Sequence, residues 1–218
     1  MVRPFLMFRP GSSLAGAWQT CLMRNLIVVA FMEPVAEGLE FPRDDWPLHI
    51  TLVKFDVAAR ASVRPSAPNP GPQDGGPQDA GPQTPANQDA AKATPEDPLT
   101  EMLASLMEDA VARALGSTLI VGRDDGFGRR GSIPVNLIEP SEMLAGLHTE
   151  LVRIVQDLPG RISTPAYTLE GFRPHVSHHG DKRLNQGDAV GLDRIALVDM
   201  APDGGHATRK VLKLWANP

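Results

Sequence analysis

The chain has 218 residues, a hydrophobic fraction of 42% and a formal net charge of −5. This apolar content suffices for a hydrophobic core and excludes disorder along the whole chain. A single cysteine excludes an internal disulfide and a cysteine-ligated zinc or iron–sulfur site. The mildly acidic balance argues against a broad basic surface for duplex nucleic acid, but it leaves room for a small anion site.

The longest apolar run, residues 26–32, is far shorter than the roughly 20 residues that a membrane-spanning helix needs. Arg3 and the apolar residues 5–8 resemble the start of a secretory signal, but Arg9 and Pro10 interrupt it. We therefore expect a cytoplasmic protein without a membrane segment.

Two segments are predicted to lie outside the folded domain. Residues 1–22 show neither helical nor alternating periodicity and are interpreted as a loose tail, with translation beginning at Met23. Residues 64–98 hold nine of the 21 prolines and no Val, Ile, Leu, Met or aromatic residue. Because such a segment buries nothing, folding cannot offset its ordering entropy. It is interpreted as a disordered insertion in one domain spanning 23–218; a proline-rich ligand for a partner domain is the alternative.

The first ordered elements are two strands and a helix. Apolar runs predict strands at 26–32 and 48–55. Apolar residues at helical spacing predict a helix over 99–115, which Gly116 ends. The stretch between the two strands is short and leaves room for a single helical turn after Pro34.

The middle of the chain is again predicted to form two strands followed by a helix. Strands are predicted at 118–121 and 134–138, with the glycine-rich turn 126–131 between them. The helix that follows begins after Ser141, which caps it, and its apolar face extends to Val155.

The last part of the chain is predicted to be strands. They are expected near 167–169 and 175–177, and as a closing hairpin of 194–200 with 210–215. No regular strand–helix–strand rhythm is present. We therefore expect an α+β fold with a mainly antiparallel sheet.

Two short segments, His49–Thr51 and His175–Ser177, share one pattern. Each has a histidine, a β-branched aliphatic residue and a hydroxyl residue, and a proline lies just before the histidine or one residue further upstream. On a strand, the first and third residues share one face while the second points to the other. Each segment therefore presents an imidazole and a hydroxyl together, and its central residue anchors the strand in the core.

This combination of side chains suits a phosphate. An unperturbed imidazole titrates near pH 6.5, so two of them can act as base and acid at neutral pH. Two hydroxyls can donate hydrogen bonds to the non-bridging oxygens. Histidines on opposite sides of one phosphorus can activate the attacking oxygen and protonate the leaving oxygen, and no metal is needed.

The two segments resemble the signature of the two-histidine (2H) phosphoesterase superfamily, especially its 2′-5′ RNA ligase and cyclic phosphodiesterase branch. The strand at 26–32 and the Leu147-His148 helix add to the likeness, which extends essentially from Met23 to the C-terminus. The two histidines are 126 residues apart, and the insertion accounts for 35 of these. The resemblance implies a two-lobed α+β fold with pseudo-twofold symmetry, mainly antiparallel sheets and one motif per lobe facing a central cleft.

By this resemblance, His49 and His175 are the general acid and base, and Thr51 and Ser177 bind the substrate phosphate. The implied activity is metal-independent and acts on 2′-5′ phosphodiesters or 2′,3′-cyclic phosphates of RNA ends or small nucleotides, by hydrolysis or by ligation. No cofactor, membrane or obligate protein partner is implied, and we expect a monomer. Which histidine is the acid stays open.

Two alternative functions compete with this one. A non-enzymatic module could bind RNA or nucleotide phosphates on the same fold, but the presence of both histidines favours an enzyme. A metallohydrolase could use His49, His175, His178 and His179. However, no predicted helix carries two histidines with a glutamate between them, as the zinc-binding helix of such enzymes does. The segment Asp124–Gly128 lacks the further acidic positions of a calcium loop.

Several charged residues are auxiliary candidates. His179 shares the face of the second motif if that strand continues, and is otherwise an exposed turn histidine. Lys182 and Arg183 follow this motif, and Arg129 and Arg130 lie in the glycine-rich turn. Each pair can hold a substrate phosphate or form solvated surface.

Two further histidines are expected to be structural or surface residues. His148 falls on the apolar face of its helix and is expected to be a hydrogen-bonded core residue. His206 lies in the predicted hairpin turn and is expected to be exposed.

Overall fold

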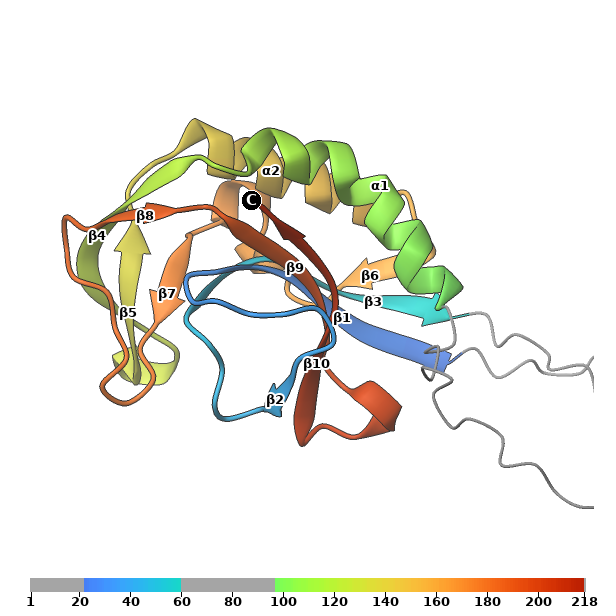
Figure 1. Cartoon of the computed structure of the whole chain (residues 1–218). Helices are drawn as coiled ribbons and strands as arrows, with labels where there is room; N and C mark the ends of the chain where they lie inside the picture. Colours follow the sequence, from blue (N-terminus) through green and yellow to red (C-terminus); the bar gives the residue numbers. More distant parts are fainter. Residues whose placement is uncertain (1–21, 60–96, 218) are drawn as a thin grey trace, which may run out of the picture.

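The computed structural model describes residues 22–59 and 97–217 (Figure 1). Most of the predicted tail and of the predicted insertion therefore lies outside the described residues. Leu22 begins the first strand and Pro98 begins the first helix. The folded domain thus includes the last residue of the predicted tail and the last two residues of the predicted insertion.

Ten strands form one sheet within the described residues, and all of its strand pairs are antiparallel. The strands are β1 (Leu22–Phe31), β2 (Glu40–Pro42), β3 (His49–Ala59), β4 (Thr118–Phe127), β5 (Ile133–Ile138), β6 (Gly160–Ile162), β7 (His175–Ser177), β8 (Ala189–Gly191), β9 (Arg194–Asp199) and β10 (Thr208–Ala216). Their order is β2-β10-β9-β1-β3-β7-β5-β4-β8, and β6 pairs with β3. The α+β class and the mainly antiparallel sheet are confirmed.

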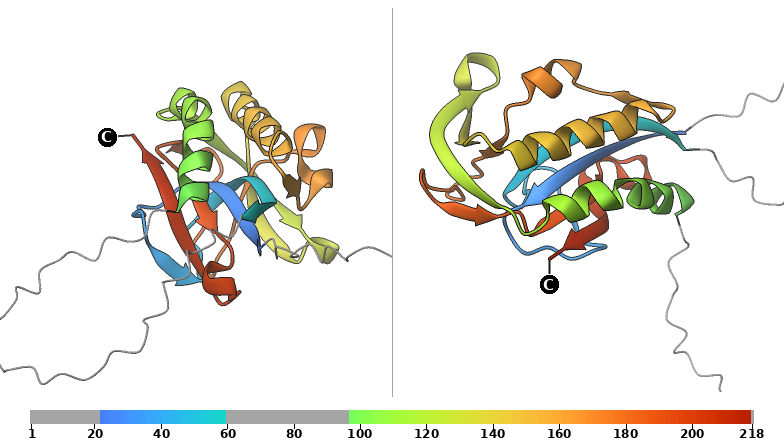
Figure 2. Two further views of the ribbon diagram at one scale, coloured as in Figure 1. Left: turned by 90° about the vertical axis from the view of Figure 1, so that its right-hand side faces the viewer. Right: turned by 90° about the horizontal axis from the view of Figure 1, so that it is seen from above.

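Two helices, α1 (Pro98–Ala114) and α2 (Glu142–Gln156), lie side by side on one face of the sheet (Figures 1 and 2). Asp97 caps α1 by accepting hydrogen bonds from the Leu99 and Thr100 amides, and Arg24 of β1 forms an ion pair with it. Ser141 caps α2 as predicted. No helix in the described part of the chain is both long and apolar enough to cross a membrane.

Strand β1 is buried on both faces from Leu26 to Phe31, which explains the unbroken apolar sequence of that part. Its alternate residues belong to two cores. The core under the helices includes Leu26, Val28 and Ala30, and the core on the other face includes Ile27, Val29 and Phe31. The second core also contains Phe41 and Trp46. Both faces of the sheet centre are therefore packed, which fixes the position of its neighbour β3.

Strand β3 contains a bulge at Leu52. Val29 pairs with Thr51 and Val28 pairs with Val53, so Leu52 has no partner on β1. The extra residue reverses which side chains face the helices, because consecutive side chains alternate. Even-numbered residues face them before the bulge and odd-numbered residues after it.

Two expectations are corrected. The predicted strand at 167–169 is wrong, because this segment forms two 3-10 turns, Pro165–Tyr167 and Leu169–Gly171. Gly171 lies so close to the Ala166 carbonyl oxygen that the Cβ of any larger residue would clash with it. The residues after Pro34 form no helical turn; they lead to the short edge strand β2.

Candidate active site

The two motif strands meet at one ladder pair, in which Ile50 of β3 lies opposite Val176 of β7. Both side chains are fully buried and anchor their strands in the core, as predicted. An antiparallel pair has a local twofold axis at its centre. On each side of this pair, the next position along the two strands therefore brings the histidine of one motif beside the hydroxyl residue of the other.

Each motif histidine is held by the same hydrogen bond. The Nδ1 atom of His49 lies 2.8 Å from the Pro47 carbonyl oxygen, and that of His175 lies 2.8 Å from the Arg173 carbonyl oxygen. A carbonyl only accepts, so Nδ1 carries the hydrogen in both rings. Nε2 of each ring is then the nitrogen that can take up or release a proton.

An aromatic ring packs against each of these histidines. The centroid of the Trp46 ring is 4.5 Å from that of His49, and Phe31 adds an edge contact. The Phe127 centroid is 4.3 Å from that of His175. This packing excludes water and disfavours the charged form of both imidazoles.

The pKa values reflect this burial. Desolvation lowers the pKa of His49 to about 4, and the nearby charges of His179 and His175 act in the same direction. Desolvation also lowers the pKa of His175, and the charge of Arg173 adds to it. Both rings are therefore neutral at pH 7 in the free protein, and a bound phosphate anion would raise both pKa values.

A cavity of about 540 Å³ lies between the two parts of the sheet that the motif strands join. Three of the four motif side chains, Thr51, His175 and Ser177, line it, whereas His49 lies outside its lining. Lys54 also lines this cavity, because the bulge at Leu52 turns it to the face of Thr51. No pattern in the sequence singled out this lysine.

The rest of this lining is largely apolar. It includes Phe127, Ile133, Tyr167 and Phe172, and two of these are well exposed: Tyr167 at 67% and Ile133 at 47%. Exposed aromatic and aliphatic side chains next to hydroxyl and imidazole groups form a site with both apolar and phosphate-binding character.

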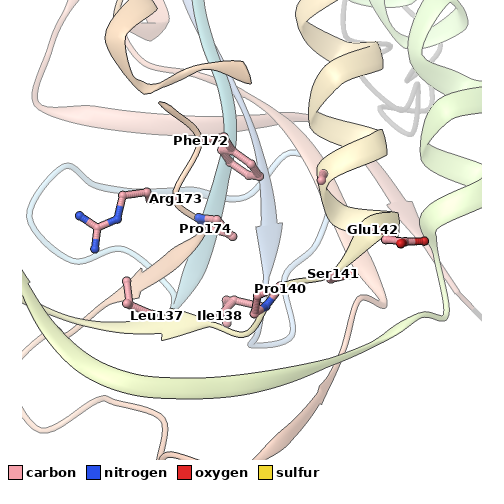
Figure 3. A pocket seen from close by; sticks show the side chains of 9 residues that line it. Leu137, Ile138, Pro140, Ser141, Glu142, Phe172, Arg173 and Pro174 are labelled. Atoms are coloured by element: carbon pink, nitrogen blue, oxygen red, sulfur yellow. The ribbon is translucent and has the colours of Figure 1, made fainter. Parts of the chain in front are cut away.

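A second cavity, of about 580 Å³, lies beside the start of α2 (Figure 3). The segment Phe172–Pro174 contributes to it, and Phe172 and Arg173 also line the first cavity. Figure 3 shows Arg173 reaching away from α2, while Phe172 and Pro174 lie nearer to the helix. No motif side chain lines this second cavity, so the candidate chemistry belongs to the first.

A buried hydrogen-bond network holds the turn that follows the second motif. The side chain of Asn136, which is fully buried on β5, accepts hydrogen bonds from His178 Nε2 at 2.9 Å and from the Leu184 amide at 3.2 Å. Its own amide donates to Asp124 at 2.5 Å. Asn136 interrupts an otherwise apolar strand sequence, and that interruption was the available signal for it.

The same turn lies beside the first motif. Strand β7 ends at Ser177, and His179 and Lys182 exchange two main-chain hydrogen bonds of 3.0 Å. The Lys182 amino group lies 3.9 Å from Glu33 and 3.8 Å from Asp45. His179 thus comes near His49 through a turn and not by continuation of the strand, and Lys182 already has carboxylate partners.

The other candidates lie at the surface or in the core. Arg129, Arg130 and Arg183 are exposed and do not line the cavity. His206 is exposed and His148 is buried, as predicted. Within residues 22–59 and 97–217, no group of three or more His, Cys, Asp or Glu residues is placed to hold a metal ion.

Comparison with known proteins finds a distant likeness among solved structures. No family model and no curated protein matches the chain. Among solved structures, the crystal structure of E. coli LigT complexed with 3′-AMP is similar over 89% of this chain and 98% of that chain, with a TM-score of 0.43 and 15% sequence identity.

Proposed function

We propose that this chain is a metal-independent phosphoesterase of the two-histidine type. It acts on 2′-5′ phosphodiester or 2′,3′-cyclic phosphate groups of RNA ends or nucleotides. The observation that carries the proposal is the Ile50–Val176 pair, which brings two equivalent histidine–hydroxyl arrangements together. Their matching Nδ1 hydrogen bonds leave Nε2 of both rings for proton transfer.

The geometry supports an acid–base mechanism at phosphorus. The Nε2 atom of one neutral histidine takes the proton from the attacking water or ribose hydroxyl. The other histidine, protonated in the complex, donates its Nε2 proton to the leaving oxygen, so the number of protons is conserved. Thr51 and Ser177 donate hydrogen bonds to the non-bridging oxygens as negative charge redistributes. Each Nδ1–H bond to a carbonyl stabilises the ring when it is positively charged.

The cavity accounts for the rest of the substrate. Its motif side chains bind the reacting phosphate, and the exposed ring of Tyr167 offers a face on which a nucleobase can stack. Lys54 supplies a positive charge in the same cavity. This combination favours nucleotides and RNA ends over small phosphate monoesters.

The test is turnover of three substrates in EDTA: adenosine 2′,3′-cyclic phosphate, a 2′-5′ dinucleotide and its 3′-5′ isomer. We expect turnover of at least one of the first two, and its loss in the His49→Ala/His175→Ala double variant. Turnover that EDTA abolishes, or that the double variant keeps, contradicts the proposal. Nucleotide binding by a folded protein without turnover would support the binding module instead.

A further inference from the structure

His148 has a hydrogen bond on both ring nitrogens. It lies on α2 with 1% of its surface exposed. Its Nδ1 atom is 2.6 Å from the Leu52 carbonyl oxygen, and its Nε2 atom is 2.8 Å from the Leu169 amide nitrogen. Since a carbonyl only accepts and an amide only donates, His148 is the neutral tautomer with hydrogen on Nδ1. Desolvation, which lowers its pKa, favours the same neutral form.

The Leu52 end of this bridge supports the first motif. Leu52 is the bulge residue of β3, which has no partner on β1, and it directly follows Thr51. Its carbonyl is satisfied by the His148 side chain. A buried carbonyl without a partner destabilises its surroundings, so His148 stabilises the bulge that directs Thr51 and Lys54 to the cavity.

The Leu169 end supports the cavity wall. Leu169 has a φ of 53°, in the left-handed region that a leucine adopts only at an energetic cost. Phe172 stacks on His148 with parallel rings 3.8 Å apart. Tyr167, Thr168 and Phe172 line the cavity, and the chain continues from them into the second motif.

We infer that His148 is a positioning residue that sets the shape of the substrate cavity, by tying the bulge of β3 to the segment 165–172. It contacts no reacting atom. Removing its bond to Leu169 loosens the wall that contacts the nucleoside and weakens substrate binding, while proton transfer at the motif histidines is retained. The inference rests on the proposed function for its link to substrate.

Two substitutions separate the ends of the bridge. In His148→Asn, the side-chain amide can replace Nδ1 and keep the bond to Leu52, but nothing reaches Leu169. In His148→Gln, the side-chain oxygen can replace Nε2 and accept from Leu169. Both variants lose the ring that stacks on Phe172, so each is a matched control for the other.

We expect KM for the best substrate of the panel to rise about tenfold more in His148→Asn than in His148→Gln, the equivalent of about one hydrogen bond. The kcat of both variants should stay within about twofold of each other. Urea unfolding of both gives the change in stability. Equal KM values in the two variants overturn the inference. A difference in KM that is fully explained by the difference in their free energies of unfolding overturns it as well.

Hydrogen exchange at the Leu169 amide tests the bridge without any substrate. Exchange should be slow in the wild-type protein and in His148→Gln, and fast in His148→Asn. Fast exchange in the wild-type protein overturns the inference. If the wild-type protein turns over no substrate, the proposed function fails; the same comparison is then made with the Kd of adenosine 2′-monophosphate, and equal or absent binding overturns the inference as well.

Discussion

The two motif strands carry the same chemistry on very different supports. Strand β3 has 11 residues and pairs with β1, β6 and β7, whereas β7 has only three residues. The first motif is therefore fixed mainly by main-chain ladders. The second motif is held by a ladder with β5 that covers its three residues, by the single pair with β3 and by the buried Asn136 network beside it. The shared feature is the local pattern, in which a histidine binds the carbonyl two residues earlier.

The surroundings of the two histidines differ as well. His49 is covered by Trp46 and Phe31 and lies outside the cavity lining, while His175 lines the cavity beside Phe127. The pKa of His49 falls to about 4, and that of His175 is also lowered. A repeated motif thus yields two histidines with unequal proton affinities, which suits a reaction that needs one base and one acid.

The largest expected effect comes from removing either histidine alone. His49→Asn and His175→Asn keep a group at the Nδ1 position but have no Nε2, so we expect kcat to fall between about 10²- and 10⁴-fold in each. The exposed His206→Asn is the matched control and should keep wild-type kcat. Steady-state kinetics with the preferred substrate make the comparison. Near-normal turnover in either motif variant would show that the two motif histidines are not both catalytic.

The hydroxyl residues should have the next largest effect. Thr51→Ala and Ser177→Ala each remove a donor to the developing phosphate charge, so kcat should fall about 10²- to 10³-fold. Thr51→Ser keeps the hydroxyl and should recover most of the rate. A strong loss in only one of the two alanine variants would mean that one motif binds the phosphate without the other.

Loss of Asn136 should destabilise the fold through the turn that follows the second motif. Asn136→Ala leaves the Leu184 amide and the His178 ring without their buried acceptor, which destabilises the fold by about 1–3 kcal/mol. Urea unfolding measures this change. Asn185→Ala, at an exposed position, should shift stability by less than about 0.5 kcal/mol. Equal shifts would refute the supporting role of the Asn136 network.

The pH profile reports the unequal histidines. The base must be unprotonated and the acid protonated, and the pKa values of both rings lie below the usual 6.5 in the free protein. We therefore expect kcat/KM to be highest between about pH 4 and 6.5. In Trp46→Leu, water reaches His49 and its pKa rises, so the acid limb moves to higher pH. NMR titration of the His49 ring measures that pKa directly, and an unchanged value would exclude Trp46 as the cause of its depression.

The smallest effect is expected for Lys182. Its two ion pairs with Glu33 and Asp45 are long and largely exposed, so Lys182→Ala should change stability by less than about 1 kcal/mol. Its effect on kcat/KM should be no more than about threefold at 0.15 M salt. A loss of 100-fold would mean that Lys182 leaves its carboxylates and binds the substrate phosphate.

The helices and strands that the sequence predicts correctly are those with a pattern of apolar residues along a continuous segment. The helices and the strands β1, β3, β9 and β10 were found because their apolar residues repeat over many positions. The three-residue strands β2, β6 and β8 were not, because pairing with distant segments determines them and leaves no periodicity. The segment 167–169 was misassigned, since its turns depend on contacts with His148 and on the close approach at Gly171.

The candidate site likewise has one part that the sequence predicts and another part that it does not. Both motifs are contiguous, so their four chemical side chains are visible in the sequence. Trp46 and Phe127 support the motifs, and no spacing rule indicates them. The only sequence signal for Asn136 is its position within an apolar strand. The placement of Lys54 depends on the bulge at Leu52, which shifts the alternation by one residue and is invisible in a pattern of period two.

The single pair between Ile50 and Val176 has a consequence for mutational tolerance. Because side chains alternate along a strand, a one-residue insertion or deletion beside either motif would turn its histidine and hydroxyl into the core and its aliphatic residue into the cavity. No neighbouring pair between these two strands would restore the alignment. Variant libraries of this protein should therefore vary side chains freely around the cavity, but they should keep the lengths of the segments 47–52 and 173–177 constant.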